Sequence, residues 1–205
     1  MLVRRFGFDL KEAAITFALT FSAATALGGV VGGILADRYA KDDHRRYGLL
    51  PMLSSTLALP LFLTAIYQDD WRIVAVLLFA ATFCLYAFLP TIMTVTQRLV
   101  EPRMRATAAA IHAFGQTVFG LGLGSVFLGW MSDRLASGLY GPGYAADCIG
   151  IPSGPPPAAC AAASGTGLQQ ALLVLGVFLL LAIASYWFAA KSIAGEISAL
   201  EDKPE

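Results

Sequence analysis

A small group of polar side chains lies inside apolar stretches of the sequence, where each could exchange a hydrogen bond or a proton with a bound molecule. His112 and Gln116 are four residues apart, a spacing that places both on one face of a helix. A histidine that deep in an apolar segment is costly to expose to lipid, so we expect it to face other helices or a watery cavity. The predicted substrate-cavity residues are Thr20, Thr82, Tyr86, Thr94, His112 and Gln116. For His112 the alternative is a packing residue held by a hydrogen bond.

No motif of an enzyme accompanies this group. The sequence lacks His-Glu-x-x-His, Gly-x-Ser-x-Gly, paired Cys-x-x-Cys and phosphate-loop patterns, and its two histidines, His44 and His112, belong to different elements. Asp42, Asp43 and His44 are consecutive residues of a charged stretch, which makes a poor cage for a metal ion, so we interpret them as solvated loop. We therefore expect no catalytic residues, no cofactor and no metal site.

The composition indicates a membrane protein. Hydrophobic residues make up 57% of the 205 residues and charged residues only 14%, and the mean hydropathy is +0.67. The formal net charge is zero, so no basic field is available to attract nucleic acid.

Apolar stretches long enough to cross a bilayer as helices can be read directly from the sequence. A hydrocarbon core needs about 20 apolar residues in helical form. Five stretches without Asp, Glu, Lys or Arg meet this length within residues 13–190: they are 13–36, 47–67, 73–97, 106–132 and 168–190. None alternates with a period of two as a barrel strand would, so the sequence predicts an all-α membrane protein of five transmembrane helices.

The positions of lysine and arginine predict the orientation. Nine lie in the segments on one side of the membrane and five on the other, and the side with nine should be cytoplasmic. The nine are Arg38, Lys41, Arg45, Arg46, Arg98, Arg103, Arg105, Lys191 and Lys203, and the five are Arg4, Arg5, Lys11, Arg72 and Arg134. Residues 191–205 then form a cytoplasmic tail and residues 1–12 an outer segment. The Ala-rich, Gly/Pro-rich composition favours a bacterial inner membrane.

The predicted orientation requires residues 1–12 to be exported across the membrane, and the sequence shows no obvious means of exporting them. Residues 1–12 carry Arg4, Arg5 and Lys11 without a preceding apolar signal sequence. We therefore expect a helix upstream in a longer protein, with residues 1–12 as its tail.

The sequence also repeats itself at an offset of 96 residues. "LGGVVGGILADRYA" (27–40) and "LGSVFLGWMSDRLA" (123–136) agree at seven of fourteen positions. Because the offset corresponds to three helices, the two copies would cross the membrane in opposite directions, as in the inverted repeats of secondary transporters.

The first copy resembles a known loop motif. Gly33-x-x-x-Asp37-Arg38, followed by Arg45 and Arg46, is similar to the G-x-x-x-D-R-x-G-R-R motif of the major facilitator superfamily. The segments "MLVRRFGFDLKEA", "EPRMRATAAA" and "GLGLGSVFLGWMSDRL" resemble, more narrowly, its spinster-like lipid transporters. The resemblance implies that the five helices form most of one six-helix half, about helices eight to twelve of twelve. Ala40 stands where the family usually has glycine, and residues 41–44 lengthen the loop.

A gating role for the motif follows from this resemblance. Asp37 is expected at the C-terminal end of its helix, where the helix dipole disfavours a carboxylate, so it should have a partner. The family implies a contact with the opposite six-helix half that breaks as the transporter inverts; the alternative is a solvated loop acid. The predicted gating residues are Gly33, Asp37, Arg38, Arg45, Arg46 and Arg105.

Glycine and proline patterns suggest how the helices pack and bend. Glycines recur four apart at Gly28/Gly32 and Gly29/Gly33, which favours close helix contact, either static or as a sliding gate. Pro90 interrupts the third predicted helix and is the predicted hinge. Cys148 and Cys160 lie in a long external loop, 137–166, where we predict a disulfide between them.

These features together predict a secondary transporter that moves a small amphipathic or lipid-like solute by alternating access. Its expected partners are the lipid bilayer and either a missing N-terminal half or a second copy of the chain. The competing hypothesis is a membrane module that does not transport, such as an inactive truncated half.

Overall fold

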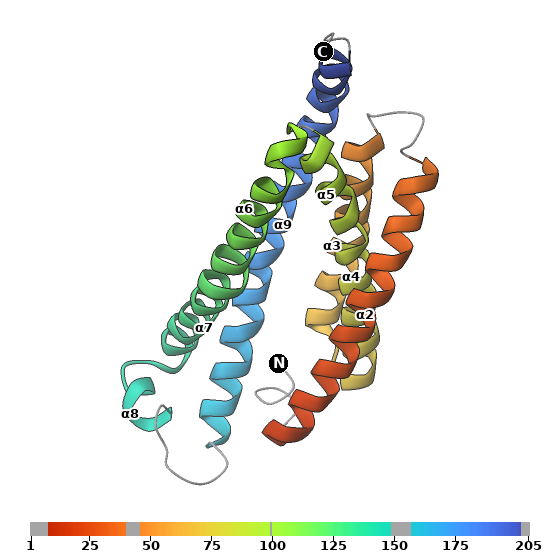
Figure 1. The fold of residues 1–205 in the computed structure, drawn as a ribbon. Helices are drawn as coiled ribbons and strands as arrows, with labels where there is room; N and C mark the ends of the chain where they lie inside the picture. Colours follow the sequence, from red (N-terminus) through yellow and green to blue (C-terminus); the bar gives the residue numbers. More distant parts are fainter. Residues whose placement is uncertain (1–7, 40–45, 99, 149–156, 202–205) are drawn as a thin grey trace. The chain divides into compact units, whose positions relative to one another are not determined.

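The computed structural model describes residues 8–39, 46–98, 100–148 and 157–201, and every regular element within these ranges is a helix (Figure 1). Among these described residues, five helical stretches are long and apolar enough to cross a membrane, which agrees with the predicted number. They are Leu10–Arg38, Leu49–Tyr67, Trp71–Arg98, Pro102–Tyr140 and Ala158–Ser192.

The first half of the chain contains α2 (Leu10–Tyr39), α3 (Arg46–Tyr67), α4 (Trp71–Ala87) and α5 (Leu89–Arg98). The second half contains a 3₁₀ turn η1 (Pro102–Met104), α6 (Arg105–Gly115), a π-helical segment η2 (Gln116–Leu123), α7 (Gly124–Tyr140), α8 (Tyr144–Cys148) and α9 (Ala158–Glu201).

Several predicted boundaries differ from these. The third predicted helix, 73–97, is two helices, α4 and α5, separated at Phe88. The fourth, 106–132, continues to Tyr140 and contains the π-helical segment. Within the predicted external loop 137–166, residues 137–140, 144–148 and 158–166 are helical, because α7 ends eight residues beyond the predicted helix end, α8 follows it, and α9 begins at Ala158. The tail predicted at 191–205 is helical as far as Glu201.

The chain divides into two compact units, each of which packs within itself. One comprises residues 18–114 and 176–205, and the other comprises residues 1–17 and 115–175.

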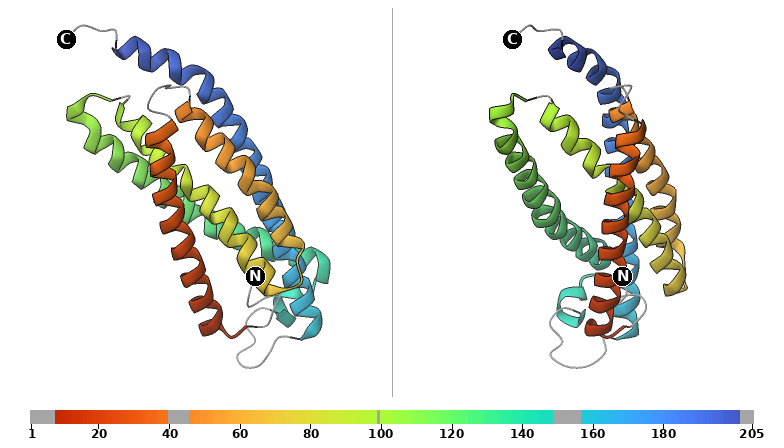
Figure 2. Two further views of the ribbon diagram at one scale, coloured as in Figure 1. Left: turned by 90° about the vertical axis from the view of Figure 1, so that its right-hand side faces the viewer. Right: turned by 45° about the vertical axis from the view of Figure 1, so that its right-hand side comes forward.

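In the unit that contains α3 and α4, these two helices lie side by side, joined by a short turn (Figure 2). The carboxylate of Asp70 accepts a hydrogen bond from the backbone N–H of Arg72 at 2.9 Å and so caps the start of α4. The last part of α9 belongs to the same unit, where the Tyr186 and Phe88 ring centroids are 5.6 Å apart.

The helix α2 packs on α4 through its smallest residues. Ala24, Gly28, Gly32 and Ala36, spaced four apart, are all buried. A methyl group built on Gly28 would lie 2.5 Å from the carbonyl oxygen of Phe83, and one on Gly32 would overlap the backbone of Ala87. Because lipid supplies no hydrophobic drive between helices, this close backbone approach is what holds the pair together.

In the unit that contains α7, the first part of α9 approaches α7 closely in the same way, at a glycine. A methyl group on Gly167 would lie 2.7 Å from the carbonyl oxygen of Ser132 and from the backbone nitrogen of Ala136. Ala136, Tyr144 and Ala163 form a small buried cluster beside this contact.

Candidate functional site

One predicted cavity residue on α4, Tyr86, contacts α2. Its ring stands edge-on to Phe21, with the centroids 5.7 Å apart and the planes at 87°. Thr20 precedes Phe21 on α2, and Thr82 lies one turn before Tyr86 on α4; all four side chains are half-buried. The structure therefore brings Tyr86 to α2, at the residue that follows Thr20.

Pro90 lies at a break between two helices. The α-helical pattern of α4 stops at Ala87, and α5 starts at Leu89 with Pro90 as its second residue, where a missing N–H costs little. The hydroxyl of Thr94 donates to the carbonyl oxygen of Pro90 at 2.9 Å. The hydroxyl hydrogen of Thr94 is thus used within its own helix, and only its oxygen can serve a ligand.

Two buried hydroxyl groups were not predicted as site residues. Thr91 on α5 and Ser55 on α3 are 0% and 1% exposed, and neither hydroxyl has a hydrogen-bond partner among the described residues. Thr91 follows Pro90 directly, and an unsatisfied polar group beside a helix break is a signal that the spacing of polar residues alone does not give.

His112 and Gln116 lie one turn apart on a continuous helical stretch. His112, on α6, is half-buried, and its buried Nε2 atom has no hydrogen-bond partner among the described residues. Gln116 is exposed and is the first residue of the π-helical segment. It belongs to the unit that contains α7, whereas the other five predicted cavity residues belong to the unit that contains α4.

The π-helical segment was not predicted. Its hydrogen-bond pattern reaches five residues back, as from the N–H of Gly124 to the carbonyl oxygen of Phe119. Such segments place an extra residue in a turn and are frequent at functional sites.

The described members of the predicted gating set lie in the last turns of α2 and at the starts of α3 and α6. Asp37 and Arg38 are exposed in the last turn of α2, and the position of a methyl group on Gly33 is open. Arg45 lies outside the described residues, and Arg46 begins α3. Arg105 begins α6, and its Nε donates to the carbonyl oxygen of Gln97 at 3.0 Å, which ties the end of α5 to the start of α6.

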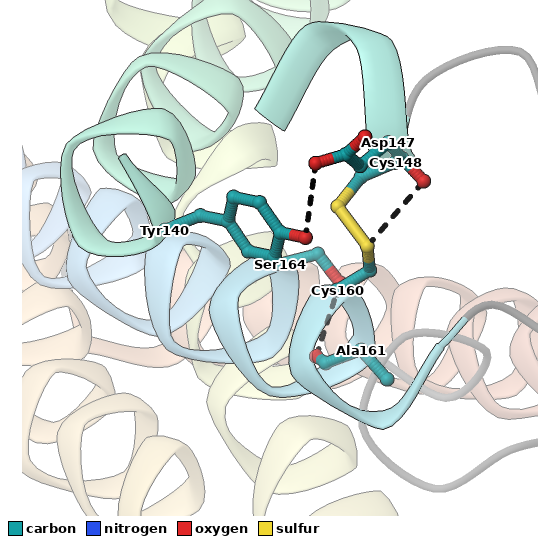
Figure 3. Close-up of a disulfide and its surroundings, with 6 residues drawn as sticks. All are labelled: Tyr140, Asp147, Cys148, Cys160, Ala161 and Ser164. Carbon is teal, nitrogen blue, oxygen red and sulfur yellow. Dashed lines mark hydrogen bonds between the residues drawn. A yellow bond between two sulfur atoms is a disulfide. The ribbon is translucent and has the colours of Figure 1, made fainter. Parts of the chain in front are cut away.

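The turn after α7 forms a compact cap, which we call the α8 cap (residues 140–148 and 160; Figure 3). A disulfide joins Cys148 to Cys160, with the Cα atoms 5.5 Å apart. The hydroxyl of Tyr140 donates to Oδ2 of Asp147 at 3.3 Å. The cap therefore fixes α8 to the start of α9. Cys84 is a buried free thiol on α4.

The two copies of the repeat are buried alike at one position. At an offset of 96, Ala36 corresponds to Ser132, and both are buried, whereas the buried Gly28 and Gly32 correspond to the half-buried Gly124 and Leu128. Asp37 and Arg38, which follow Ala36, correspond to Asp133 and Arg134, which follow Ser132.

Comparisons with known proteins agree with this geometry. The chain is 33% identical over 139 residues, 67% of its length, to an MFS-type efflux pump of Mycolicibacterium smegmatis, and the match covers 32% of that protein. The crystal structure of a bacterial homolog to the human lysosomal transporter Spinster, inward-facing and unoccupied, matches with a TM-score of 0.79 and 27% identity, covering 95% of this chain and 43% of that one. The occupied inward-facing structure matches with a TM-score of 0.74 and 26% identity, covering 96% and 44%.

The chain thus spans about a third of the curated relative and less than half of the solved chains. No family model matches it. These relatives are transporters, which as a class are not enzymes. The chain belongs to the major facilitator superfamily, and it has the fold of part of the superfamily's spinster-like transporters.

Proposed function

We propose that this chain is the C-terminal part of a secondary transporter, about helices eight to twelve, and that it moves a small amphipathic or lipid-like solute by alternating access. The observation that carries the proposal is the match of 95% of the chain, at a TM-score of 0.79, to an inward-facing transporter. The same fold has been solved both unoccupied and occupied in that conformation. Because the curated relative is an efflux pump, we propose outward movement of the solute.

The character of the cavity residues supports an amphipathic solute. The group around Tyr86 offers hydroxyls and aromatic ring surface, with Phe21 at 5.7 Å and no acidic or basic side chain among the predicted members on α2 and α4. Ring surface of this kind suits an apolar body, and the few hydroxyls suit one neutral polar end. His112, with its unpartnered Nε2, is the proposed hydrogen-bonding residue on α6.

We propose that a second six-helix half, either an N-terminal half or another copy of this chain, completes the transport path. Asp37 and Arg38, exposed at the end of α2, would contact that half on the cytoplasmic side. The proposed location is a bacterial inner membrane with the C-terminus in the cytoplasm, as the distribution of basic residues favours. The competing function is a membrane module that does not transport.

The test is transport in proteoliposomes loaded with a fluorescent lysophosphatidylcholine. The chain is reconstituted alone and together with the part of the Mycolicibacterium smegmatis pump that lies outside the match. Transport in either preparation supports the proposal and identifies which half is needed. Absence of transport in both, with the chain inserted, would favour the non-transporting module.

Two matched tyrosine variants make the test specific. Tyr86→Phe keeps the ring contact with Phe21 and removes only the hydroxyl, so the initial rate should fall by about 2-fold to 12-fold, the range for one lost hydrogen bond. Tyr140→Phe removes a hydroxyl from the α8 cap and should leave the rate unchanged. Equal effects of the two substitutions would argue against a cavity around Tyr86.

A further inference from the structure

The end of α7 and the turn into α8 border an open surface hollow of about 570 Å³ that none of the predicted site residues line. Arg134 and Ser137 line it from α7, and Gly141, Pro142 and Tyr144 line it from the turn. Arg134 is its single charged lining residue. The nearest acidic residue of the α8 cap, Asp147, does not line the hollow and accepts a hydrogen bond from Tyr140.

The α8 cap gives this hollow a fixed wall. Tyr144 is 6% exposed and its ring packs edge-on against Tyr140, with the centroids 5.8 Å apart. The disulfide between Cys148 and Cys160 then holds α8 to α9. A wall that is buried on one side and crosslinked keeps its shape without a ligand, which reduces the cost of binding one.

The surroundings of Arg134 are typical of an arginine at the membrane interface. Its guanidinium lies over the ring of Trp130, 5.6 Å from the centroid. The helical span that carries it runs from Pro102 to Tyr140, 39 residues, about twice what the hydrocarbon core requires. The stretch of this span without charged residues ends at Ser132, so we place its last turns, with Arg134, in the headgroup layer, where tryptophan and arginine are favoured.

An exposed apolar strip continues from Arg134 along α7. Trp130, Phe127 and Val126 lie four, seven and eight residues before Arg134, on the same face of the helix. They are 55%, 38% and 69% exposed. The Phe127 and Trp130 rings are neighbours, with their centroids 6.3 Å apart.

We propose that the hollow binds the anionic headgroup of a membrane phospholipid, with its phosphate on Arg134 and an acyl chain along the strip of Trp130, Phe127 and Val126. A guanidinium matches a phosphate in charge and in planar, two-bond geometry. The apolar strip selects a lipid over a soluble phosphate, because a free anion would gain nothing from it. This site lies apart from the residues around Tyr86 and does not depend on transport.

The test is quenching of Trp130 fluorescence by brominated lipids. The full chain with Trp71→Phe and Trp187→Phe keeps Trp130 as its single tryptophan. It is reconstituted in vesicles that contain dibrominated phosphatidylglycerol or dibrominated phosphatidylcholine. We expect phosphatidylglycerol to quench with an apparent affinity about fivefold higher, the effect of one arginine near an anionic lipid.

Substitutions separate the site from general charge effects. Arg134→Gln should reduce the preference for phosphatidylglycerol to about one, and Arg134→Lys should leave an intermediate preference. Arg72→Gln in the same background is the matched control, because it removes one arginine that does not line the hollow. Unchanged quenching by dibrominated phosphatidylcholine shows that Arg134→Gln still inserts; if it does not insert, the Arg134→Lys result decides.

Three outcomes would overturn the proposal. Absence of quenching by either lipid would mean that protein covers this face of α7. Relief of quenching by millimolar inorganic phosphate would mean that the hollow binds a free anion. An equal loss of preference in Arg72→Gln would mean that the surface charge alone attracts the lipid.

Discussion

Gly32 is the residue that best shows how tightly α2 and α4 pack. A methyl group there would overlap the backbone of Ala87, which cannot move aside as a flexible side chain would. Gly33, its neighbour and the first residue of the loop motif, has nothing within 4 Å of the same methyl position. The two adjacent glycines therefore have different physical roles.

We predict opposite effects for alanine at these two positions. Gly32→Ala should lower the free energy of unfolding by about 1–3 kcal/mol through overpacking. Gly33→Ala should be neutral or raise it by up to about 1 kcal/mol, because alanine favours a helix more than glycine does. Thermal unfolding of the purified protein in detergent measures both. Equal destabilisation would show that α2 does not approach α4 at Gly32.

The cysteines allow a second prediction about single residues. The chain has three cysteines, of which Cys148 and Cys160 form the disulfide and Cys84 is free. Maleimide added to denatured protein isolated without reductant should therefore modify one thiol, and after reduction it should modify three. Mass spectrometry counts the additions, and a Cys84→Ala variant should give none and two. Three additions without reductant would mean that the cap is not crosslinked in the cell.

At the scale of elements, the features predicted from the sequence are those that depend on the length and polarity of apolar stretches, such as the number of candidate spans. Five such stretches gave the number of spans, since a run of that length has no other stable arrangement in lipid. Features that depend on the local geometry of a single helical turn were not predicted. The π-helical segment at Gln116–Leu123 inserts a residue into a turn without changing the apolar pattern.

The predicted cavity residues show the same limit. A spacing of four placed Thr82 and Tyr86 on one face of α4, as the structure has them. No spacing could reveal that Phe21 of α2 meets Tyr86, because contacts between helices depend on where small residues permit a close approach. The length of α7 was missed because the predicted stretch excluded charged residues and so stopped before Asp133 and Arg134, although the helix continues to Tyr140.

The helix break at Phe88 leads to a prediction about how α4 and α5 are joined. Pro90→Ala restores an N–H that can donate to the carbonyl oxygen of Tyr86 and so join α4 to α5. Hydrogen exchange of the amides of residues 88–92 should slow by about fivefold, which corresponds to one added hydrogen bond of about 1 kcal/mol. Pro60→Ala, inside α3, is the control and should leave these amides unchanged. Unaltered exchange in Pro90→Ala would show that the break does not depend on the proline.

At the scale of the whole molecule, orientation in the membrane links the charges to the disulfide. If each of the five candidate spans among the described residues crosses the membrane once, the start of α2 and the end of α9 lie on opposite sides. If the side rich in basic residues is cytoplasmic, the α8 cap faces outward, where thiols oxidise and a disulfide persists. The reverse orientation would place the disulfide in a reducing compartment. The charge distribution and the cysteine pair are independent features of the chain, and they favour the same orientation.

Cysteine accessibility tests this orientation directly. On a Cys84→Ala background with the disulfide left intact, Asp69→Cys places a thiol in the turn between α3 and α4, and Arg103→Cys places one between α5 and α6. A membrane-impermeant maleimide should label Asp69→Cys in intact cells and label Arg103→Cys only after permeabilisation. The two turns flank a single span, α4 with α5, so they must react on opposite sides if that span crosses the membrane once. Reversed labelling would place the cap inside, and labelling of both thiols from outside would mean that α4 and α5 do not form one span despite their combined length.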